Sequence, residues 1–124
     1  MIYGIGTDIV EIGRIRDAVD KWGDRFLKRI YTDNEIAYCY RKKDPFPHLA
    51  ARFAAKEALF KASNIHASFS DIETVNEDSG KPFIHFREDL LTASFKSKSL
   101  LVHVTLSHER SHAIATVILE RKTE

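Results

Sequence analysis

The chain has 124 residues, of which 44% are hydrophobic and 30% charged, a composition typical of a globular domain with a buried core. Its formal net charge of +1 at pH 7 gives no argument for nucleic-acid binding, and its single cysteine excludes an intrachain disulfide and a thiolate metal cluster. No apolar run approaches the length of a membrane span, and no secretory leader precedes the first strand pattern. We therefore expect one cytoplasmic domain over residues 1–124. We expect it to bind neither nucleic acid nor membrane.

The opening segment alternates small or polar residues with larger apolar ones, as a strand with two different faces does. Gly4, Gly6 and Asp8 fall on one face, and we expect the strand to end at Asp8. Glycine weakens a strand interior, but it lets another backbone, a helix or a ligand approach closely. The sequence therefore predicts a close neighbour beside Asp8, whose carboxylate interrupts an otherwise apolar strand.

Residues 11–30 have apolar residues at helical spacing on both sides of Gly23, which predicts two short helices. Thr32 and Glu35 have the spacing of a capping box, so a further helix begins there and continues to about Tyr40. A helix that ran through Gly23 without a break would place four basic side chains on one stripe: Arg14, Lys21, Arg25 and Lys28.

The central helix is expected to begin at Pro47, after a proline-rich break, and to continue to about Ser63. At about 100° per residue, Glu57 points into an apolar arc with Phe60, Ala50 and Ala54, in which Lys61 is the other charged residue. Burial of an unpaired carboxylate is costly, so Glu57 needs a cation or a metal ion, and Lys61 one turn later is the nearest candidate. The alternative is an ordinary exposed Glu57–Lys61 helix pair, worth roughly 0.3 kcal/mol.

The second half of the chain is dominated by strand patterns. Residues 71–86 alternate as two strands across a turn at residues 77–80, where Gly80 supplies the positive φ that such a reversal often needs. A short helical stretch is expected near residues 87–96, and residues 99–120 predict two long strands joined by a turn. This order of elements favours an α+β fold with a mainly antiparallel sheet packed on the central helix.

The turn between the last two strands contains HERSH, from His108 to His112, which matches the zinc metalloprotease string H-E-x-x-H. That chemistry needs both histidines on one face of a helix, whereas the alternating residues on either side predict strand, turn and strand. We therefore reject a metalloprotease site and expect His112 to be a polar turn residue. His108 is the stronger candidate for a function because it directly follows Ser107 at a strand end.

Four blocks of sequence occur in order along the chain: GIGTDIVEIGR with Asp8, RFAAKEALFKA, the turn DSGKP and the strand end TLSH. Together they resemble the short bacterial 4′-phosphopantetheinyl transferases of the holo-[acyl-carrier-protein] synthase type, from Ile5 to about Val117. The resemblance implies transfer of the phosphopantetheine arm of coenzyme A to a serine of apo acyl carrier protein, with release of 3′,5′-ADP, in support of fatty acid biosynthesis. It also implies an Mg²⁺ cofactor and a homotrimer with active sites between subunits.

By this resemblance, Asp8 and Glu57 hold Mg²⁺ against the pyrophosphate of coenzyme A, and Lys61 neutralises charge on the phosphate oxygens. Mg²⁺ is commonly held by one or two carboxylates together with substrate phosphates and water, which suits this pair. The residues leave the general base open among Asp8, Glu57 and a metal-bound water relayed to a carboxylate, and the last is preferred because both carboxylates already serve as ligands. The positions that match coenzyme A contacts are Arg52, Lys61, Gly80, Lys81, Pro82, Ser107 and His108.

The resemblance also assigns a docking face for the acidic carrier protein. The matching positions are Arg14, Arg25, Phe26 and Arg29, an aromatic anchor among charges that steer the encounter. The alternative for these residues is an ordinary solvated helix face. In a homotrimer, Ser107 and His108 of one chain would complete the site formed by Asp8 and the central helix of another.

The chain departs from the family pattern in the link after the central helix. Where relatives have a glycine-rich link that borders the nucleotide, no glycine lies between Ala62 and Asp71, and Thr105 replaces a commoner serine in the last block. Two other functions remain open. A non-catalytic carrier-protein or nucleotide-binding module would bind a carrier without changing its mass, and an Mg²⁺-dependent phosphoesterase would release phosphopantetheine without needing a carrier.

Overall fold

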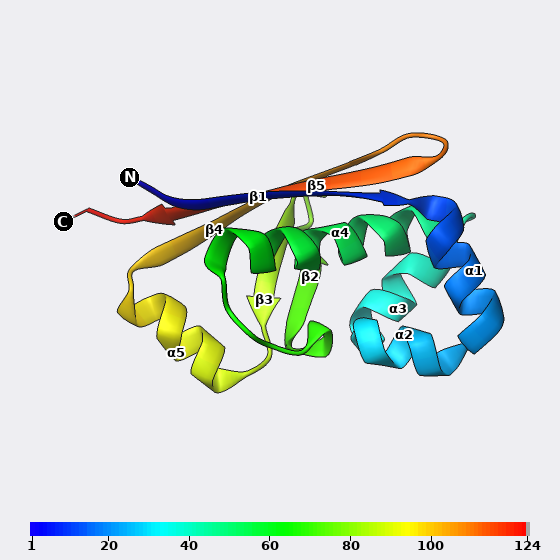
Figure 1. Ribbon diagram of the computed structural model, residues 1–124, viewed down its shortest axis with the longest axis horizontal. Coiled ribbons are helices and arrows are strands. Elements are labelled where there is room, and N and C mark those ends of the chain that lie inside the picture. The colour runs from blue at the N-terminus through cyan, green and yellow to red at the C-terminus, as the bar shows by residue number, and fades with distance from the viewer. Residues whose placement is uncertain (124) are drawn as a thin grey trace.

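A computed structural model describes residues 1–123, which form a three-stranded sheet, a separate two-stranded hairpin, five α-helices and a short 3₁₀-helix (Figure 1). The strands are β1 (Ile2–Glu11), β2 (Ile72–Asn76), β3 (Pro82–Phe86), β4 (Leu100–His108) and β5 (His112–Arg121). The helices are α1 (Ile12–Trp22), α2 (Asp24–Ile30), α3 (Asp33–Tyr40), α4 (Pro45–Ser63), the 3₁₀-helix η1 (Phe69–Asp71) and α5 (Asp89–Ser97). None of the helices within residues 1–123 has both the length and the apolar character that a membrane crossing requires.

The three-stranded sheet is antiparallel and has the order β1-β5-β4, which confirms the expected mainly antiparallel α+β fold. Ala115 of β5 lies opposite Asp8 of β1 on one side and opposite Leu106 of β4 on the other. The expected end of the first strand at Asp8 is wrong, because pairing with β5 continues until Glu11 meets His112. Asp8 therefore lies within an edge strand, held on one side by backbone pairing.

Helix α4 runs along one face of this sheet, and its backbone lies directly against β1 (Figure 1). A Cβ atom added at Gly6 would lie 2.1 Å from the carbonyl oxygen of Ala58, and one added at Gly4 would lie 2.0 Å from that of Ala62. The expectation of a close neighbour beside Asp8 is therefore confirmed, and the neighbour is the central helix. Glycine is required at both positions because any side chain would occupy the space of the helix backbone.

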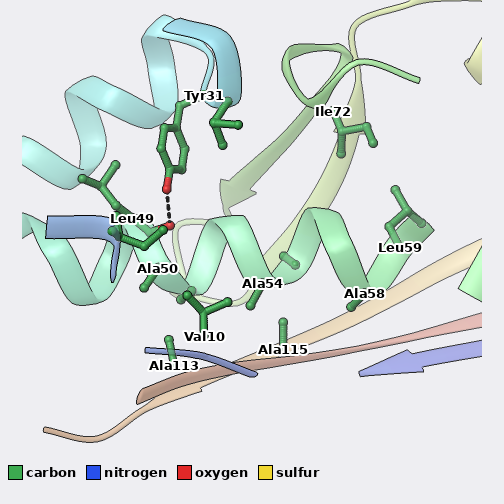
Figure 2. Packing of buried hydrophobic residues seen from close by; sticks show 14 of the residues in the cluster. Val10, Tyr31, Leu49, Ala50, Ala54, Ala58, Leu59, Ile72, Ala113 and Ala115 are labelled. Atoms are coloured by element: carbon green, nitrogen blue, oxygen red, sulfur yellow. Dashed lines mark hydrogen bonds between the residues drawn. The ribbon is translucent and has the colours of Figure 1, made fainter. Parts of the chain in front are cut away.

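The core between α4 and the sheet is made largely of small side chains, as Figure 2 shows. Its buried members at this contact include Val10, Ala50, Ala54, Ala58, Ala113 and Ala115. On the other side of α4, the hydroxyl of buried Tyr31 donates a hydrogen bond to the carbonyl oxygen of Leu49 over 2.8 Å. Small residues allow close approach, so backbone contact sets the position of α4 relative to β1.

The helix caps follow the chemistry expected from the sequence, with one shift. Thr32 and Glu35 form the predicted capping box at the start of α3. Helix α4 begins at Pro45 and not at Pro47, because the side chain of Asp44 accepts a hydrogen bond from the first turn and proline is well tolerated at the first helical position. The central helix is therefore one half-turn longer than predicted.

Gly23 ends α1 and precedes α2 in a backbone conformation with φ 56° and ψ −133°. The prediction of two helices around this residue is confirmed. Because the helix breaks here, the continuous basic stripe of Arg14, Lys21, Arg25 and Lys28 does not form.

The hairpin of β2 and β3 is also confirmed, with Gly80 at φ 94° in its turn. Helix α5 begins two residues later and ends one residue later than expected from residues 87–96. Strands β4 and β5 are joined by residues 109–111, so HERSH spans a strand, a turn and a strand, as predicted. Its two histidines lie on different strands and cannot form the helical zinc motif.

Candidate active site

Strand β1 and helix α4 bring Asp8, Glu57 and Lys61 to one place. Asp8 lies on the strand face that packs against α4, and its side chain is 17% exposed. The Nζ atom of Lys61 donates to Asp8 Oδ1 over 3.0 Å and to the carbonyl oxygen of Thr7 over 3.0 Å. From the sequence, Lys61 is expected to pair with Glu57, but the ion pair joins Lys61 to Asp8. The close approach of α4 to β1 puts the lysine within reach of the strand.

Glu57 is half-buried on the turn of α4 that precedes Lys61. Burial raises the pKa of its carboxyl group, the nearby Asp8 carboxylate raises it further, and Lys61 acts in the opposite direction. The negative charge of Asp8 thus disfavours ionisation of Glu57, although Lys61 is paired with Asp8. A further cation between them would relieve that repulsion.

Asp8 and Glu57 line an open groove of about 500 Å³. Much of its wall is apolar and includes Ile15 of α1, Phe26 of α2 and Phe53 of α4. Apolar walls with a few converging polar groups are typical of small-molecule sites. The groove therefore combines apolar walls with two carboxylates.

His112 lines the same groove, which the sequence did not predict, because it was expected to be only a polar turn residue. It begins β5, and its Nδ1 atom lies 2.8 Å from Ser111 Oγ. The Ser111 hydroxyl and the backbone N–H groups of Ser111 and His112 lower the pKa of Glu109 to about 2. The turn thus holds His112 against the groove. In the sequence, the position of His112 at a strand end after a compact turn was the available signal for this role.

The donor set of the groove fits a hard divalent cation. Among residues 1–123, no three His, Cys, Asp or Glu side chains gather to form a metal cage. A pair of carboxylates is instead the contribution that proteins commonly make to Mg²⁺, which keeps several waters and takes substrate phosphates as further ligands. Asp8 and Glu57 are the residues that could hold such an ion.

Arg52 forms a second cluster, on another side of α4. Its side chain is 2% exposed, so it is not a solvated surface charge. Its Nη2 atom donates to Asn76 Oδ1 over 2.6 Å, and the Asn76 side chain donates to the carbonyl oxygen of Gly80 over 2.9 Å. The guanidinium lies 4.1 Å from the ring centroid of Tyr38, and its Nε atom is buried without a partner in the described part of the chain. Arg52 is therefore tied to the turn that carries exposed Lys81.

The residues expected to contact coenzyme A do not all gather around Asp8 within one chain. Arg52 and Glu57 are five positions apart on α4, which places them about 140° apart around the helix axis. On β4, Ser107 points to the face of the sheet away from α4, whereas Asp8 points toward α4. The His108 ring lies 5.4 Å from that of His48 at the start of α4. One chain thus presents two groups of expected site residues in two places.

Lys56, next to Glu57, has a structural function that the sequence analysis missed. It is fully buried, and its Nζ atom donates to Glu35 Oε1 over 2.7 Å, to the Ile30 carbonyl oxygen over 2.7 Å and to the Phe69 carbonyl oxygen over 2.8 Å. Burial lowers the pKa of Lys56, and the Glu35 carboxylate opposes that shift. Three donors meet three acceptors, so α4 is fixed to α2, α3 and η1 beside Glu57. A lysine in the apolar part of a helix was the available signal.

The residues expected to bind a partner divide between two cavities. Arg14 lines the groove that contains Asp8 and Glu57. Arg25 and Arg29 line a second cavity of about 430 Å³, together with Trp22. Phe26 lines both, so it forms the wall between the two cavities.

Comparisons with known proteins identify the family and the fold of this chain. Residues 4–117 match the sequence model described as the 4'-phosphopantetheinyl transferase superfamily. The holo-[acyl-carrier-protein] synthase of Halothermothrix orenii is 45% identical over 97% of this chain and 98% of its own length. The crystal structure of the Neisseria meningitidis synthase covers 98% of this chain and 100% of its own, with a TM-score of 0.88 and 36% identity. The Bacillus anthracis synthase, solved in complex with CoA (3',5'-ADP), has a TM-score of 0.80 and 38% identity and covers 98% of this chain and 99% of its own.

Proposed function

The chain belongs to the 4′-phosphopantetheinyl transferase superfamily, and from this premise we propose that it transfers the 4′-phosphopantetheine arm of coenzyme A to a serine of apo acyl carrier protein. The second product is 3′,5′-ADP. We place the reaction in the cytoplasm, in support of fatty acid biosynthesis. The observation that carries the proposal is the arrangement of Asp8, Glu57 and Lys61 beside an open groove.

In the proposed reaction, the serine oxygen bonds to the β-phosphorus of coenzyme A while the serine proton passes, directly or through water, to the carboxylate of Asp8 or Glu57. The bond from that phosphorus to the bridging oxygen breaks, and the 3′,5′-ADP leaves with the bond's electron pair. Asp8 and Glu57 would hold Mg²⁺, which supplies charge neutralisation to the pyrophosphate when it is bound. Lys61 is half-exposed, so its ammonium can turn from Asp8 toward the phosphate oxygens and stabilise the negative charge that develops there.

For the nucleotide end of coenzyme A, we propose the second group of residues. The backbone of Gly80 and Pro82 and the side chain of Lys81 form a turn that Arg52 fixes through Asn76. Arg52 is buried, so its role in this proposal is to position the turn, while the exposed ammonium of Lys81 would meet the phosphate. Ser107 and His108 would contribute from the end of β4.

We propose a homotrimer because it brings the two groups together. The sheet face away from α4 is open and carries large apolar side chains, with Ile5 62% and Ile9 63% exposed on either side of a threonine row. Ile9, Ile114 and Ser107 form one row across the three strands on this face. A copy of the chain that covers this face buries the isoleucines and brings its own Asp8 edge toward Ser107.

The trimer predicts a defined response to one charged substitution. In light scattering, we expect the wild-type protein to have the mass of three chains and Ile9→Arg to have the mass of one. Ile9→Arg should also lose transfer activity, because arginine cannot be buried in this apolar contact without a partner. Leu90→Arg is the control, since Leu90 is 78% exposed on α5 and lies outside the sheet. A wild-type protein that is monomeric and fully active would refute the intersubunit site.

The transferase is tested by weighing a carrier. Purified protein, coenzyme A, Mg²⁺ and an apo acyl carrier protein are incubated, and the carrier is analysed by mass spectrometry with and without a chelator. We expect a gain of one phosphopantetheine arm that the chelator prevents. An unchanged carrier would favour the binding module, and release of free phosphopantetheine without a carrier would favour the phosphoesterase.

A further inference from the structure

Helix α4 meets the sheet through a surface with few protrusions. The buried side chains at this contact are mostly alanines, and Gly4 and Gly6 let the backbone of β1 touch that of the helix (Figure 2). Small side chains set how closely a helix lies to a strand, but without ridges that interlock they resist its sliding and rotation weakly. The Lys61–Asp8 pair adds little, because the Lys61 side chain is 53% exposed. The rotation of α4 about its axis is therefore set mainly from its other side.

Lys56 supplies directional contacts on that other side. The residue is fully buried, and its Nζ atom donates to Glu35 Oε1, to the Ile30 carbonyl oxygen and to the Phe69 carbonyl oxygen over 2.7–2.8 Å. Hydrogen bonds weaken steeply when they are misaligned, whereas apolar contacts have no preferred direction. A buried ammonium that loses an acceptor is strongly unfavourable. A slide or a rotation of α4 therefore strains three bonds at once.

The acceptors of Lys56 are themselves held in place. Glu35 is 1% exposed, and its Oε1 atom also accepts the backbone N–H of Thr32 over 3.0 Å. Its Oε2 atom accepts the backbone N–H of Thr74 on β2 over 2.9 Å. The Phe69 ring in η1 stacks on Phe53 of α4, with 5.5 Å between the ring centroids. Lys56 is thus tied to groups that cannot follow the helix if it moves.

The position of Glu57 depends on this tie. Glu57 is the next residue along α4, and it lines the groove together with Asp8. Helix side chains extend about 5–6 Å from the axis, so a rotation of about 10° moves the Glu57 carboxylate by roughly 1 Å. A misplacement of this size can cost roughly a hundredfold in rate.

We infer that Lys56 is a positioning residue for the transfer reaction, whose bonds to Glu35 and to two backbone carbonyls hold α4 at the rotation in which Glu57 lies beside Asp8. The inference rests on the proposed function, because it concerns the carboxylate pair that we propose for Mg²⁺. Lys56 acts through the helix and touches no substrate.

Two variants separate positioning from stability. Lys56→Met removes the ammonium and keeps a side chain of similar length, and Glu35→Gln in the same chain removes the charge that is then left unpaired. Removal of one partner of a buried ion pair is strongly destabilising, whereas replacement of both is often nearly neutral. We therefore expect Lys56→Met to lower the unfolding temperature and the double variant to recover much of it. If Lys56→Met does not fold, the double variant carries the comparison.

Phe95→Leu is the matched control. Phe95 is 5% exposed on α5, which packs on β3 and β4, so the substitution weakens the core without touching the bonds of Lys56. It should lower the unfolding temperature and leave catalysis and metal binding unchanged.

All proteins are compared at a temperature at which thermal unfolding curves show them folded. We expect kcat to fall about a hundredfold in Lys56→Met and equally in the double variant, with the KM for the carrier unchanged. Binding of Mn²⁺, as a spectroscopic substitute for Mg²⁺, is measured without substrates from the loss of the free-ion electron paramagnetic resonance signal. Its affinity should fall about tenfold in both variants, as it does when a group that orients a metal ligand is lost.

The outcomes distinguish this inference from the proposed function. A double variant with wild-type kcat and Mn²⁺ affinity would show that Lys56 only stabilises the fold, and would leave the transferase intact. Equal losses in Phe95→Leu would also overturn the inference, because they would follow from stability alone. Wild-type protein that binds Mn²⁺ but adds no mass to the carrier, with weaker binding in the double variant, would support the positioning and overturn the transferase. Wild-type protein that does neither would overturn both.

Discussion

Glu57→Gln lowers the rate of phosphopantetheine transfer by roughly 10²–10³-fold in our expectation, because the amide removes the negative charge that would hold the cation at the reacting phosphates. The substitution keeps the size and shape of the side chain, so the groove and α4 should remain in place. Transfer is measured at saturating coenzyme A and carrier over a series of Mg²⁺ concentrations. Glu11→Gln is the matched control, since Glu11 is exposed and lines the same groove without taking part in the cluster. Full activity of Glu57→Gln at limiting Mg²⁺ would remove Glu57 from the site.

A comparison of the wild-type protein with Glu57→Gln also tests the raised pKa of Glu57. A carboxyl whose pKa is higher in the folded than in the unfolded state stabilises the fold most at low pH, and this contribution is lost as pH rises through the folded pKa. In chelator, we therefore expect the stability of wild type relative to Glu57→Gln to fall as pH rises above the ordinary value of 4.5 and then to level off. Thermal unfolding of the two proteins across this range gives the difference. A relative stability that rises with pH would mean that the pKa is lowered.

Gly6→Ala should damage both the fold and the site. The added Cβ would lie 2.1 Å from the carbonyl oxygen of Ala58 and 2.9 Å from the backbone nitrogen of Ala62, and backbone atoms cannot rotate away as a flexible side chain can. Helix α4 must move off β1, which costs roughly 1–3 kcal/mol or more in the free energy of unfolding. The same movement separates Glu57 and Lys61 from Asp8, and a misplacement of about 1 Å can cost roughly a hundredfold in rate.

Gly13→Ala provides the control for this prediction. Gly13 lies in the first turn of α1 with nothing within 4 Å of an added Cβ, so alanine there should stabilise the protein by roughly 0.5–1 kcal/mol. Chemical denaturation gives the two free energies of unfolding, and the carrier mass assay gives the two rates. Gly6→Ala with wild-type stability and wild-type transfer would show that α4 can shift without consequence for the site.

Local patterns were enough to predict most of the fold from the sequence. Alternation gave β1 and the β4–β5 pair, the capping box at Thr32 gave α3, and Gly80 gave the hairpin turn. The glycines of β1 correctly indicated a close neighbour. The end of β1 was misplaced because Asp8 looks like a strand terminus in sequence, whereas pairing with β5, which lies more than a hundred residues away, extends the strand to Glu11.

The candidate site was less accessible to sequence reasoning, because its contacts join distant segments. A helix pattern offers Lys61 a partner four residues earlier, but the tertiary contact of α4 with β1 gives it Asp8 instead. Local rules assign the charged residues Arg52 and Lys56 to the surface. Both are buried, and the hydrogen-bond acceptors that make this possible lie on other elements of the fold. Helical periodicity correctly singled out Glu57 as a partly buried carboxylate, but it could not show that Asp8 of β1 lies near it.

The buried ammonium of Lys56 has a consequence for how the protein assembles. Its three acceptors come from α2, α3 and η1, which are separate in sequence, and an ammonium enclosed without acceptors is strongly unfavourable. Helix α4 therefore cannot settle against only one of these elements, and partly closed forms with Lys56 already enclosed are disfavoured. The residue next to Lys56 is Glu57, so the contacts that make α4 settle as one cooperative unit also fix the carboxylate that we propose for the metal site.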